Sequence, residues 1–308
     1  MENHLAGILW MLLTMCLFVS MDTVVKYLTQ DFSQFQIVWA RFFFHMMCLT
    51  ILLRQQLLGV FLSGDLKLQL TRSLLLMLTT LLFFSGLRST ELSTATAIMF
   101  LSPIFVTVLA VPLLGERVGP RRLIGVMTGF LGALIIVHPQ AGAGGVVTDL
   151  PASEGRWAWL PEPGHLLVIC AAACNALYQI MTRRLRMVDS AMTTLLYSGV
   201  VGSIVLSIGV PSVWKSPEPV QWLLLVCVGL LGCVSHFCLI RAFRNAPASL
   251  VVPFSYSSLL WATLFGFLVF DALPDRWTLA GASLIIGSGL YIFYRERSVN
   301  AGNVADNA

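Results

Sequence analysis

The sequence predicts an all-α integral membrane protein whose ten transmembrane helices form two inverted repeats of five. Three observations predict this fold: an apolar composition, a series of long uncharged stretches, and an uneven distribution of basic residues. Hydrophobic residues make up 57% of the 308 residues and charged residues 11%, against about 45–50% and about 25% in soluble domains. This composition excludes a soluble globular protein and makes the lipid bilayer a partner. The net charge of only +4 argues against nucleic acid as a partner.

Ten stretches of the chain meet or approach the length of about 20 mostly apolar residues that a membrane-spanning helix needs. None alternates like a strand, and a helix satisfies every backbone polar group within lipid. The predicted spans are Leu5–Leu28, Gln34–Leu53, Leu68–Leu87, Leu92–Leu114, Arg121–Val137, Gly164–Met181, Ala191–Val210, Val220–Ile240, Ala248–Phe270 and Trp277–Tyr294.

Basic residues between the spans predict the orientation. If the N-terminus is cytoplasmic, the even-numbered connections and the C-terminal tail carry 13 Lys and Arg, with Arg72 counted among them, and the opposite side carries four. Cytoplasmic loops are enriched in Lys and Arg. We therefore expect both termini in the cytoplasm.

The longest connection divides the chain into halves with an odd number of spans each. The predicted units are residues 1–140 as the first five-helix repeat, 141–163 as an external linker, 164–296 as the second repeat and 297–308 as a disordered cytoplasmic tail. At an offset of 155 residues, Gly115-Glu116 aligns with Phe270-Asp271. Related halves with five spans each must insert in opposite orientations, as in many secondary transporters.

Motifs in these halves point to a family. The second span contains Arg41, and G-E-R-x-x-P-x-x-x-x-G-x-x-x-x-x-x-G begins at Gly115, with a weaker echo around Asp271 and Gly287. With the 5+5 arrangement, these features resemble the EamA type of the drug/metabolite transporter superfamily over nearly the whole chain. The runs S-M-D-T-V-V-K-Y-L and F-Q-I-V-W-A-R resemble the branch that includes riboflavin and S-adenosylmethionine carriers. The resemblance implies a secondary transporter that moves a small organic metabolite by alternating access.

Three charged residues within the first two spans are predicted to form a gate or coupling element. A charge within lipid costs about 2.5–3.5 kcal/mol and normally faces the bundle interior. Asp22 and Lys26 lie four residues apart on one helix face, and Arg41 lies at about the depth of Asp22, 9–10 Å below the outer helix ends. An Asp22–Arg41 pair is therefore available, either as a structural ion pair or as part of an external gate or proton-coupling element, with Lys26 as a competing partner for Asp22.

Six further residues are predicted to line a substrate pocket. They are His45, Asn175, Tyr178, Gln179, Tyr256 and Trp261. Imidazole titrates near neutrality and is a candidate proton carrier, the amides and Tyr178 form a polar stripe, and aromatic rings near the midplane can stack on a planar solute. Structural roles remain as alternatives: His45 could be a packing residue, and the polar stripe could form hydrogen bonds between helices without a ligand. His236 is a weaker candidate for a functional histidine.

Prolines in the fourth and ninth spans, Pro103, Pro112 and Pro253, permit bends that suit either a gate or a passive kink. Glu116 and Asp271 close these spans and are interpreted as interfacial charges outside the pocket. Phe83 and Phe84 are candidates for an aromatic cage, with packing as the alternative.

Several activities find no support in the sequence. No phosphate-binding G-x-x-x-x-G-K-[ST] and no hydrolase motif occurs, so we expect no enzyme, no cofactor, and a drive that comes from a gradient, with protons a candidate coupling ion. All seven cysteines lie in apolar stretches and are interpreted as packing residues rather than metal ligands. Alternatives are a non-transporting membrane sensor or assembly factor on the same scaffold, or a membrane-embedded enzyme.

Overall fold

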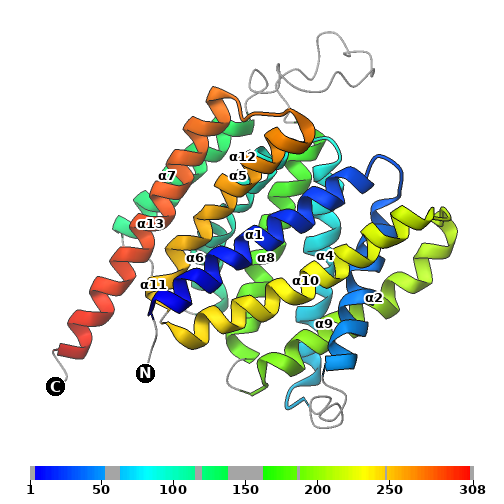
Figure 1. The fold of residues 1–308 in the computed structure, drawn as a ribbon. Helices are drawn as coiled ribbons and strands as arrows, with labels where there is room; N and C mark the ends of the chain where they lie inside the picture. Colours follow the sequence, from blue (N-terminus) through cyan, green and yellow to red (C-terminus); the bar gives the residue numbers. More distant parts are fainter. Residues whose placement is uncertain are drawn as a thin grey trace.

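The computed structural model describes residues 4–52, 63–114, 120–137, 162–185, 188–246 and 248–305, and these ranges are helical throughout apart from their connections. Figure 1 shows long helices packed side by side in one bundle. In the N-terminal half (residues 4–137) the helices are α1 His4–Leu28, α2 Gln34–Leu52, α4 Leu66–Leu87, α5 Leu92–Met99, α6 Ser102–Leu114 and α7 Pro120–Val137. In the C-terminal half (residues 162–305) they are α8 Pro163–Leu185, α9 Ala191–Gly209, η1 Val210–Val213, α10 Pro219–Asn245, α11 Ala248–Val251, η2 Val252–Tyr256, α12 Ser257–Phe270 and α13 Arg276–Ala305.

Eight helical segments of the described chain are long and apolar enough to cross a membrane. They are α1, α2, α4, α5 with α6, α8, α9 with η1, α10, and η2 with α12. Helix α7, where the fifth span is predicted, contains a shorter apolar stretch over Ile124–Ile136, and the predicted tenth span lies within α13. The fold is therefore that of a multi-pass helical membrane protein.

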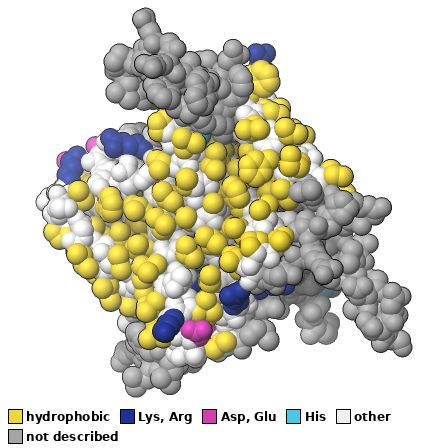
Figure 2. Space-filling view, turned by 180° about the vertical axis from the view of Figure 1, so that it is seen from behind, with side chains coloured by type: hydrophobic (Ala, Val, Ile, Leu, Met, Phe, Trp, Pro, Cys, Tyr) yellow, Lys and Arg dark blue, Asp and Glu magenta, His cyan; other side chains and the backbone are white. Residues whose placement is uncertain are grey.

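The outer surface of the bundle is apolar. Ile208, Leu260 and Leu223 are 81%, 72% and 69% exposed, which water would penalise and lipid does not. Figure 2 shows hydrophobic side chains spread over the middle of one face, with Lys, Arg, Asp and Glu toward its edges. The bundle thus presents to its surroundings the belt that a bilayer requires.

Two of the predicted spans are not continuous helices, and this corrects the sequence-based expectation. The stretch predicted as Leu92–Leu114 is interrupted at Phe100 and Leu101, between α5 and α6, and the stretch Ala248–Phe270 tightens into the 3-10 segment η2. Pro103 and Pro253 lie beside these interruptions, and proline has no N–H to complete the α-helical ladder. The apolar pattern gave no sign of either break because both flanks are equally hydrophobic.

Helices of one half pack along helices of the other. The most extensive contacts join α1 to α10, α4 to α8, α7 to α13 and α2 to α9. The α7–α13 contact brings backbones together: a Cβ on Gly281 would lie 2.4 Å from the Gly132 carbonyl oxygen. The start of α1 and the end of α13 lie at the same end of the bundle (Figure 1).

Candidate functional site

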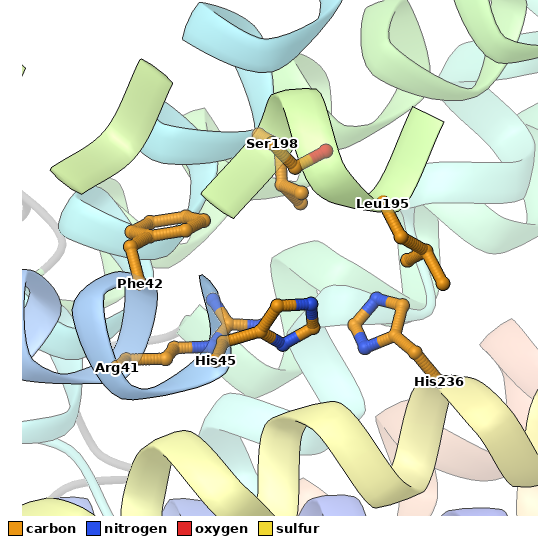
Figure 3. Close-up of a pocket in the computed structure, with 7 residues that line it drawn as sticks. Arg41, Phe42, His45, Leu195, Ser198 and His236 are labelled. Carbon is orange, nitrogen blue, oxygen red and sulfur yellow. The ribbon is translucent and has the colours of Figure 1, made fainter. Parts of the chain in front are cut away.

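A small cavity lies inside the bundle between the two halves. Its volume is about 10 Å³, room for about one water molecule. Helices α2, α4, α9 and α10 supply its lining, which consists of Arg41, Phe42, His45, Leu76, Leu195, Ser198 and His236. Figure 3 shows the ring of His45 between the Arg41 and His236 side chains, with Phe42 and Ser198 across the space from them. Polar and charged groups of both halves therefore meet at this cavity.

Glycines on α9 and α10 let α2 approach closely enough to bring these groups together. A Cβ on Gly229 of α10 would lie 2.4 Å from the Phe44 Cβ, and one on Gly202 of α9 would lie 2.5 Å from the Phe42 ring. Any larger residue at these positions would push α2 outward. The backbone approach fixes Arg41 and His45 at the interface of the halves.

The two histidines of the cavity face each other edge to face. The ring centroids of His45 and His236 lie 5.6 Å apart at 88°. The His236 Nδ1 lies 2.8 Å from the Gly232 carbonyl oxygen, and because a carbonyl only accepts, Nδ1 carries the proton. The Nε2 of His45 is buried with no hydrogen-bond partner. A histidine that serves only in packing would have both ring nitrogens hydrogen-bonded or exposed, so His45 does not fit that alternative.

Arg41 does not form the predicted contact with Asp22. Its Nη1 donates to the Thr80 hydroxyl on α4, and its guanidinium lies 5.4 Å from the Phe42 ring centroid and 5.7 Å from that of Phe84. The charges of Asp22 and Arg41 interact, but no ion pair within 4.0 Å joins them in the described part of the chain. Equal depth left the rotation of each helix about its own axis undetermined, so the contact could not be fixed by counting residues.

Lys26 is not a competing partner for Asp22. Its Nζ donates to the carbonyl oxygens of Leu87 and Thr90, at 3.1 and 2.6 Å, and lies 5.5 Å from the Phe270 ring centroid. Carbonyls at a helix C-terminus lack intrahelical donors and attract cations. Lys26 therefore joins α1 to the end of α4 and, through Phe270, to the C-terminal half.

Arg72 is the main residue that the sequence analysis missed. It was counted in a connection, but it lies within α4 and is 2% exposed, which lowers the cytoplasmic tally to 12. Its partners are all neutral: Nε donates to Thr182 Oγ1 at 2.9 Å, Nη1 to the Thr194 carbonyl at 2.9 Å and to Ser198 Oγ at 2.7 Å, and Nη2 to Tyr178 Oη at 2.7 Å. A signal existed, since the predicted span Leu68–Leu87 itself contains Arg72.

The polar stripe on α8 divides between two partners. Asn175 and Gln179 donate through their amide nitrogens to Ser102 Oγ, at 3.1 and 3.0 Å, whereas Tyr178 accepts from Arg72 and covers its guanidinium at 4.6 Å. Ser102 is the first residue after the α5–α6 interruption. The stripe therefore attaches α8 to α6 through Ser102 and to α4 through Arg72, and its residues do not line the described cavity.

Tyr256 and Trp261 lie on the other interrupted span. The Tyr256 ring centroid is 4.8 Å from that of Phe100, so the aromatic rings at the two interruptions meet. Trp261 contacts Phe265 at 6.0 Å between ring centroids, and its indole N–H is buried without a partner. Phe83 and Phe84 contact each other, and Phe84 covers Arg41. Phe84 thus contacts a residue of the cavity lining, whereas the Phe100–Tyr256 and Trp261–Phe265 pairs consist of rings that do not line the cavity.

Contacts between the halves close the bundle at both ends. At the end that carries Lys26, Gln36 Nε2 donates to the Lys215 carbonyl at 2.8 Å, and the Lys215 Nζ lies 3.9 Å from the Asp31 carboxylate. At the opposite end, Asp189 accepts hydrogen bonds from Ser63, the Gly64 N–H and Gln69, at 2.6, 2.8 and 2.9 Å. These contacts join the two halves at both ends of the bundle.

The pKa values of two carboxyl groups outside the spans are shifted in opposite directions. Burial raises the pKa of Asp189, but the hydrogen bonds from Ser63, Gly64 and Gln69 outweigh it, so the pKa lies below the ordinary aspartate value. Burial raises the pKa of Glu91, and the negative charge of Asp275 adds to the rise. These groups make the two ends of the bundle respond differently to acid.

Other predicted features lie outside the site. Glu116 falls outside the described residues, and Asp271 ends α12 in the left-handed conformation with φ of 52°. A search of the described residues finds no group of three His, Cys, Asp or Glu side chains that could hold a metal ion, and their cysteines are free thiols.

Known proteins resemble this chain over nearly its whole length. The EamA-like transporter family matches residues 5–138 and 162–294. The chain is 28% identical to a Rickettsia felis protein named S-adenosylmethionine uptake transporter, over 96% of this chain and 95% of that protein. It is 30% identical to a Vibrio cholerae riboflavin transporter over 64% of this chain and 60% of that protein. A solved crystal structure shares the fold with a TM-score of 0.61 at 19% identity, over 95% of this chain and 98% of the other.

Proposed function

The chain belongs to the EamA-like transporter family, and we propose that it moves a small organic metabolite by alternating access, with its two halves rocking about the interior cavity. The observation that carries the proposal is the position of charge. Arg41, Arg72 and His45 are buried between the halves, whereas the outer surface is apolar. Ionisable groups inside a membrane protein mark solute or ion paths.

The proposed architecture is ten spans in two inverted repeats. In this architecture α1 corresponds to α8, and α4 corresponds to α10. The α1–α10 contact then corresponds to the α8–α4 contact, and both are among the most extensive in the bundle, which supports the repeat. The interruption at Phe100 also lies 155 residues before Ser255 in η2, the offset that aligns Gly115 with Phe270. Interrupted helices near the midplane, where two repeats meet, are typical sites of solute binding in transporters.

Alternating access in this bundle consists of opening one closed end at a time. The outer layer contains Lys26, Gln36 and Lys215, and the inner layer contains Asp189 and its donors. A cavity that holds about one water is too small for a metabolite, so the conformation is closed at both ends. Separation of either layer would open a path to the cavity from one side only.

We place the protein in the bacterial inner membrane with both termini cytoplasmic. The excess of Lys and Arg in the connections on one side supports this orientation. The common position of the chain ends in Figure 1 agrees with an even number of spans.

The proposed solutes contain a planar heteroaromatic ring. The relatives are named for S-adenosylmethionine and riboflavin, and adenine and flavin rings are both planar and polarisable. The aromatic group around Phe100, Tyr256 and Trp261 offers surfaces for stacking, and the free indole N–H of Trp261 offers a hydrogen-bond donor. Protons are the proposed coupling ion, with Asp22 and His45 as candidate carriers.

Counterflow in liposomes tests transport directly. Reconstituted protein is preloaded with unlabelled S-adenosylmethionine or riboflavin, and uptake of the labelled compound is followed, with protein-free liposomes as the control. We expect transient accumulation of one compound, reduced in Arg41→Ala and Asp22→Asn. Absence of counterflow for every solute favours a non-transporting role, and variants that transport like the wild type would remove these residues from the mechanism.

A further inference from the structure

Arg72 is a buried cation that joins the two halves through neutral groups alone. It lies on α4 of the N-terminal half and is 2% exposed. Four of its five N–H donors are used, and every acceptor lies on α8 or α9 of the C-terminal half. The acceptor residues are Thr182, Thr194, Ser198 and Tyr178. No carboxylate lies within 4.0 Å of Arg72 among the described residues, so its charge is held by hydrogen bonds without being neutralised.

These bonds lie between the cavity and one end of the bundle. At that end, which we call the Asp189 end, Asp189 accepts from Gln69 and from the segment Ser63–Gly64. Gln69 precedes Arg72 by three residues on the same face of α4, and Leu76, one turn after Arg72, lines the cavity. Because every acceptor of Arg72 belongs to the other half, the halves cannot separate at the Asp189 end without breaking its bonds.

A guanidinium held in this way makes the closed end sensitive to the loss of a single acceptor. Hydrogen bonds replace the hydration of a buried charge only while its donors are satisfied, and removal of one partner is costly. Neutral acceptors, unlike a carboxylate, give little attraction once the bond is broken. Water supplies new acceptors when the end opens. Arg72 therefore favours a closed end while its acceptors are in place and an open, hydrated end when one of them is withdrawn.

Ser198 connects this cation to the cavity. Its hydroxyl accepts from Arg72 Nη1 at 2.7 Å and donates to the Thr194 carbonyl at 2.8 Å. Of the four acceptor residues, only Ser198 lines the cavity, where it lies across the space from His45 (Figure 3). A polar group that enters the cavity and turns this hydroxyl toward itself removes an acceptor from Arg72.

The end that carries Lys26 is joined differently. Its cation between the halves is Lys215, whose Nζ donates to the Asp31 carbonyl at 3.1 Å and lies 3.9 Å from the Asp31 carboxylate, with side-chain exposures of 60% and 47%. Water can replace such exposed partners at little cost. The buried bond between Thr94 and Thr278, at 3.2 Å, joins two neutral hydroxyls. This end can therefore open without removing acceptors from a buried cation.

We propose that Arg72 is the gate residue of the Asp189 end and that Ser198 couples this gate to the cavity. A solute that reaches the cavity through the Lys26 end and engages Ser198 releases Arg72 to water, and the Asp189 end opens. The inference rests on the proposed alternating access and names the residues that control one of its two steps. The neutral partners have a function in this scheme, because a carboxylate bound to Arg72 would keep the end closed.

Hydrogen exchange of the full chain in lipid nanodiscs tests the gate without a solute. The reporters are the backbone segments 63–72 and 189–198, which meet at the Asp189 end, measured by mass spectrometry. Tyr178→Phe and Ser198→Ala each remove one acceptor from Arg72 with little change of shape. Since exchange follows local opening and each lost bond involves a charged group, we expect exchange about tenfold faster in both segments.

Arg72→Met distinguishes a gate from a structural tie. It removes the charge together with all four bonds, and the hydroxyls left behind keep their own acceptors, since Thr182 donates to the Tyr178 carbonyl and Ser198 to the Thr194 carbonyl. Without a cation to hydrate, exchange in both segments should stay at or below the wild-type rate. Arg72→Gln is the second neutral variant if Arg72→Met fails to fold.

Thr94→Val is the matched control, because it removes a buried hydrogen bond between the halves that does not involve Arg72. It should leave exchange in both segments unchanged. The inference is overturned if the acceptor variants exchange like the wild type, or if the neutral Arg72 variants exchange as fast as the acceptor variants, which would make Arg72 a structural tie only.

The coupling through Ser198 is tested by adding S-adenosylmethionine and riboflavin separately. The compound that gives counterflow should accelerate exchange of both segments in the wild type and give no further acceleration in Ser198→Ala. An equal response of Ser198→Ala and the wild type would overturn the coupling. Absence of counterflow for both compounds would count against the transport function itself, whereas the comparison of variants without solute would still decide the gate.

Discussion

The rings of Phe100 and Tyr256 lie 4.8 Å apart at the point where the interrupted helices of the two halves meet. Phe100 directly follows α5, and Tyr256 is the last residue of η2. Backbone groups at such interruptions lack part of the α-helical ladder and are tolerated at membrane depth where protein surrounds them. The ring contact therefore joins the least regular segments of both halves.

Gly289 on α13 determines where the Tyr256 hydroxyl can lie. A Cβ at Gly289 would be 2.1 Å from Tyr256 Oη but 3.3 Å from Cζ. We expect Gly289→Ala to lower the free energy of unfolding by about 1–3 kcal/mol through overpacking, and Tyr256→Phe to restore most of the loss because it removes the colliding oxygen. Unfolding of the purified single and double variants measures both effects.

Gly287 is the matched control for this pair, because a Cβ there would have no neighbour within 4 Å. Gly287→Ala should leave stability unchanged or improve it, since alanine favours helix over glycine by about 1 kcal/mol. A Gly289→Ala defect that persists in full with Tyr256→Phe would refute the assigned contact.

Lys26 stabilises its end of the bundle through its two hydrogen bonds to the carbonyls of Leu87 and Thr90. Lys26→Met keeps the apolar stem and removes the donors. We expect it to cost about 1.5–3 kcal/mol, as for hydrogen bonds that involve a charged group, measured by thermal unfolding at fixed detergent concentration. Arg88→Gln removes an exposed cation next to the same helix end and should have little effect. Equal melting temperatures for Lys26→Met and the wild type would show that these bonds add nothing.

The sequence was sufficient to locate the helices whose ends coincide with a change in polarity. The predicted Leu5–Leu28 and Gln34–Leu53 differ from α1 and α2 by one residue at an end, because hydrophobic length determines where a span begins and ends. Hydropathy could not locate the interruptions at Phe100 and η2, where polarity does not change, although Pro103 and Pro253 indicated that both spans could bend.

Counting from helix ends predicts a common depth for Arg41 and Asp22 but not the direction in which either side chain points. Hydropathy could not tell which faces α2 and α4 turn toward each other, so the Thr80 partner of Arg41 was missed. Arg72 was missed because it lies near the start of an apolar run and was counted with the adjoining connection, although the predicted span Leu68–Leu87 contains it.

Asp189 should stabilise its end of the bundle only when it is ionised. Hydrogen bonds from Ser63 and Gln69 and the backbone of Gly64 hold its pKa below the ordinary value despite the opposing effect of burial. A lowered carboxyl pKa gives stability that is present above the unfolded-state pKa, about 3.9, and lost as pH falls through the folded-state value. Asp189→Asn should be less stable than the wild type at pH 7, with a gap that closes below about pH 4. A gap independent of pH, in unfolding measured across pH 3 to 7, would contradict this.

Glu91 should act in the opposite sense at the end of the bundle that carries Lys26. Burial first, and then the negative charge of Asp275, raise its pKa, while Lys26 opposes them. A raised carboxyl pKa means that the folded state binds more protons, so the ionised group lowers stability above the folded-state pKa and has no effect below the unfolded-state value, about 4.3. Glu91→Gln is therefore expected to be more stable than the wild type at pH 7 and equal to it near pH 4 in the same unfolding series. If Glu91→Gln is less stable at pH 7, the attraction between Glu91 and Lys26 outweighs both burial and repulsion, and the outer end is held together by that charge pair instead.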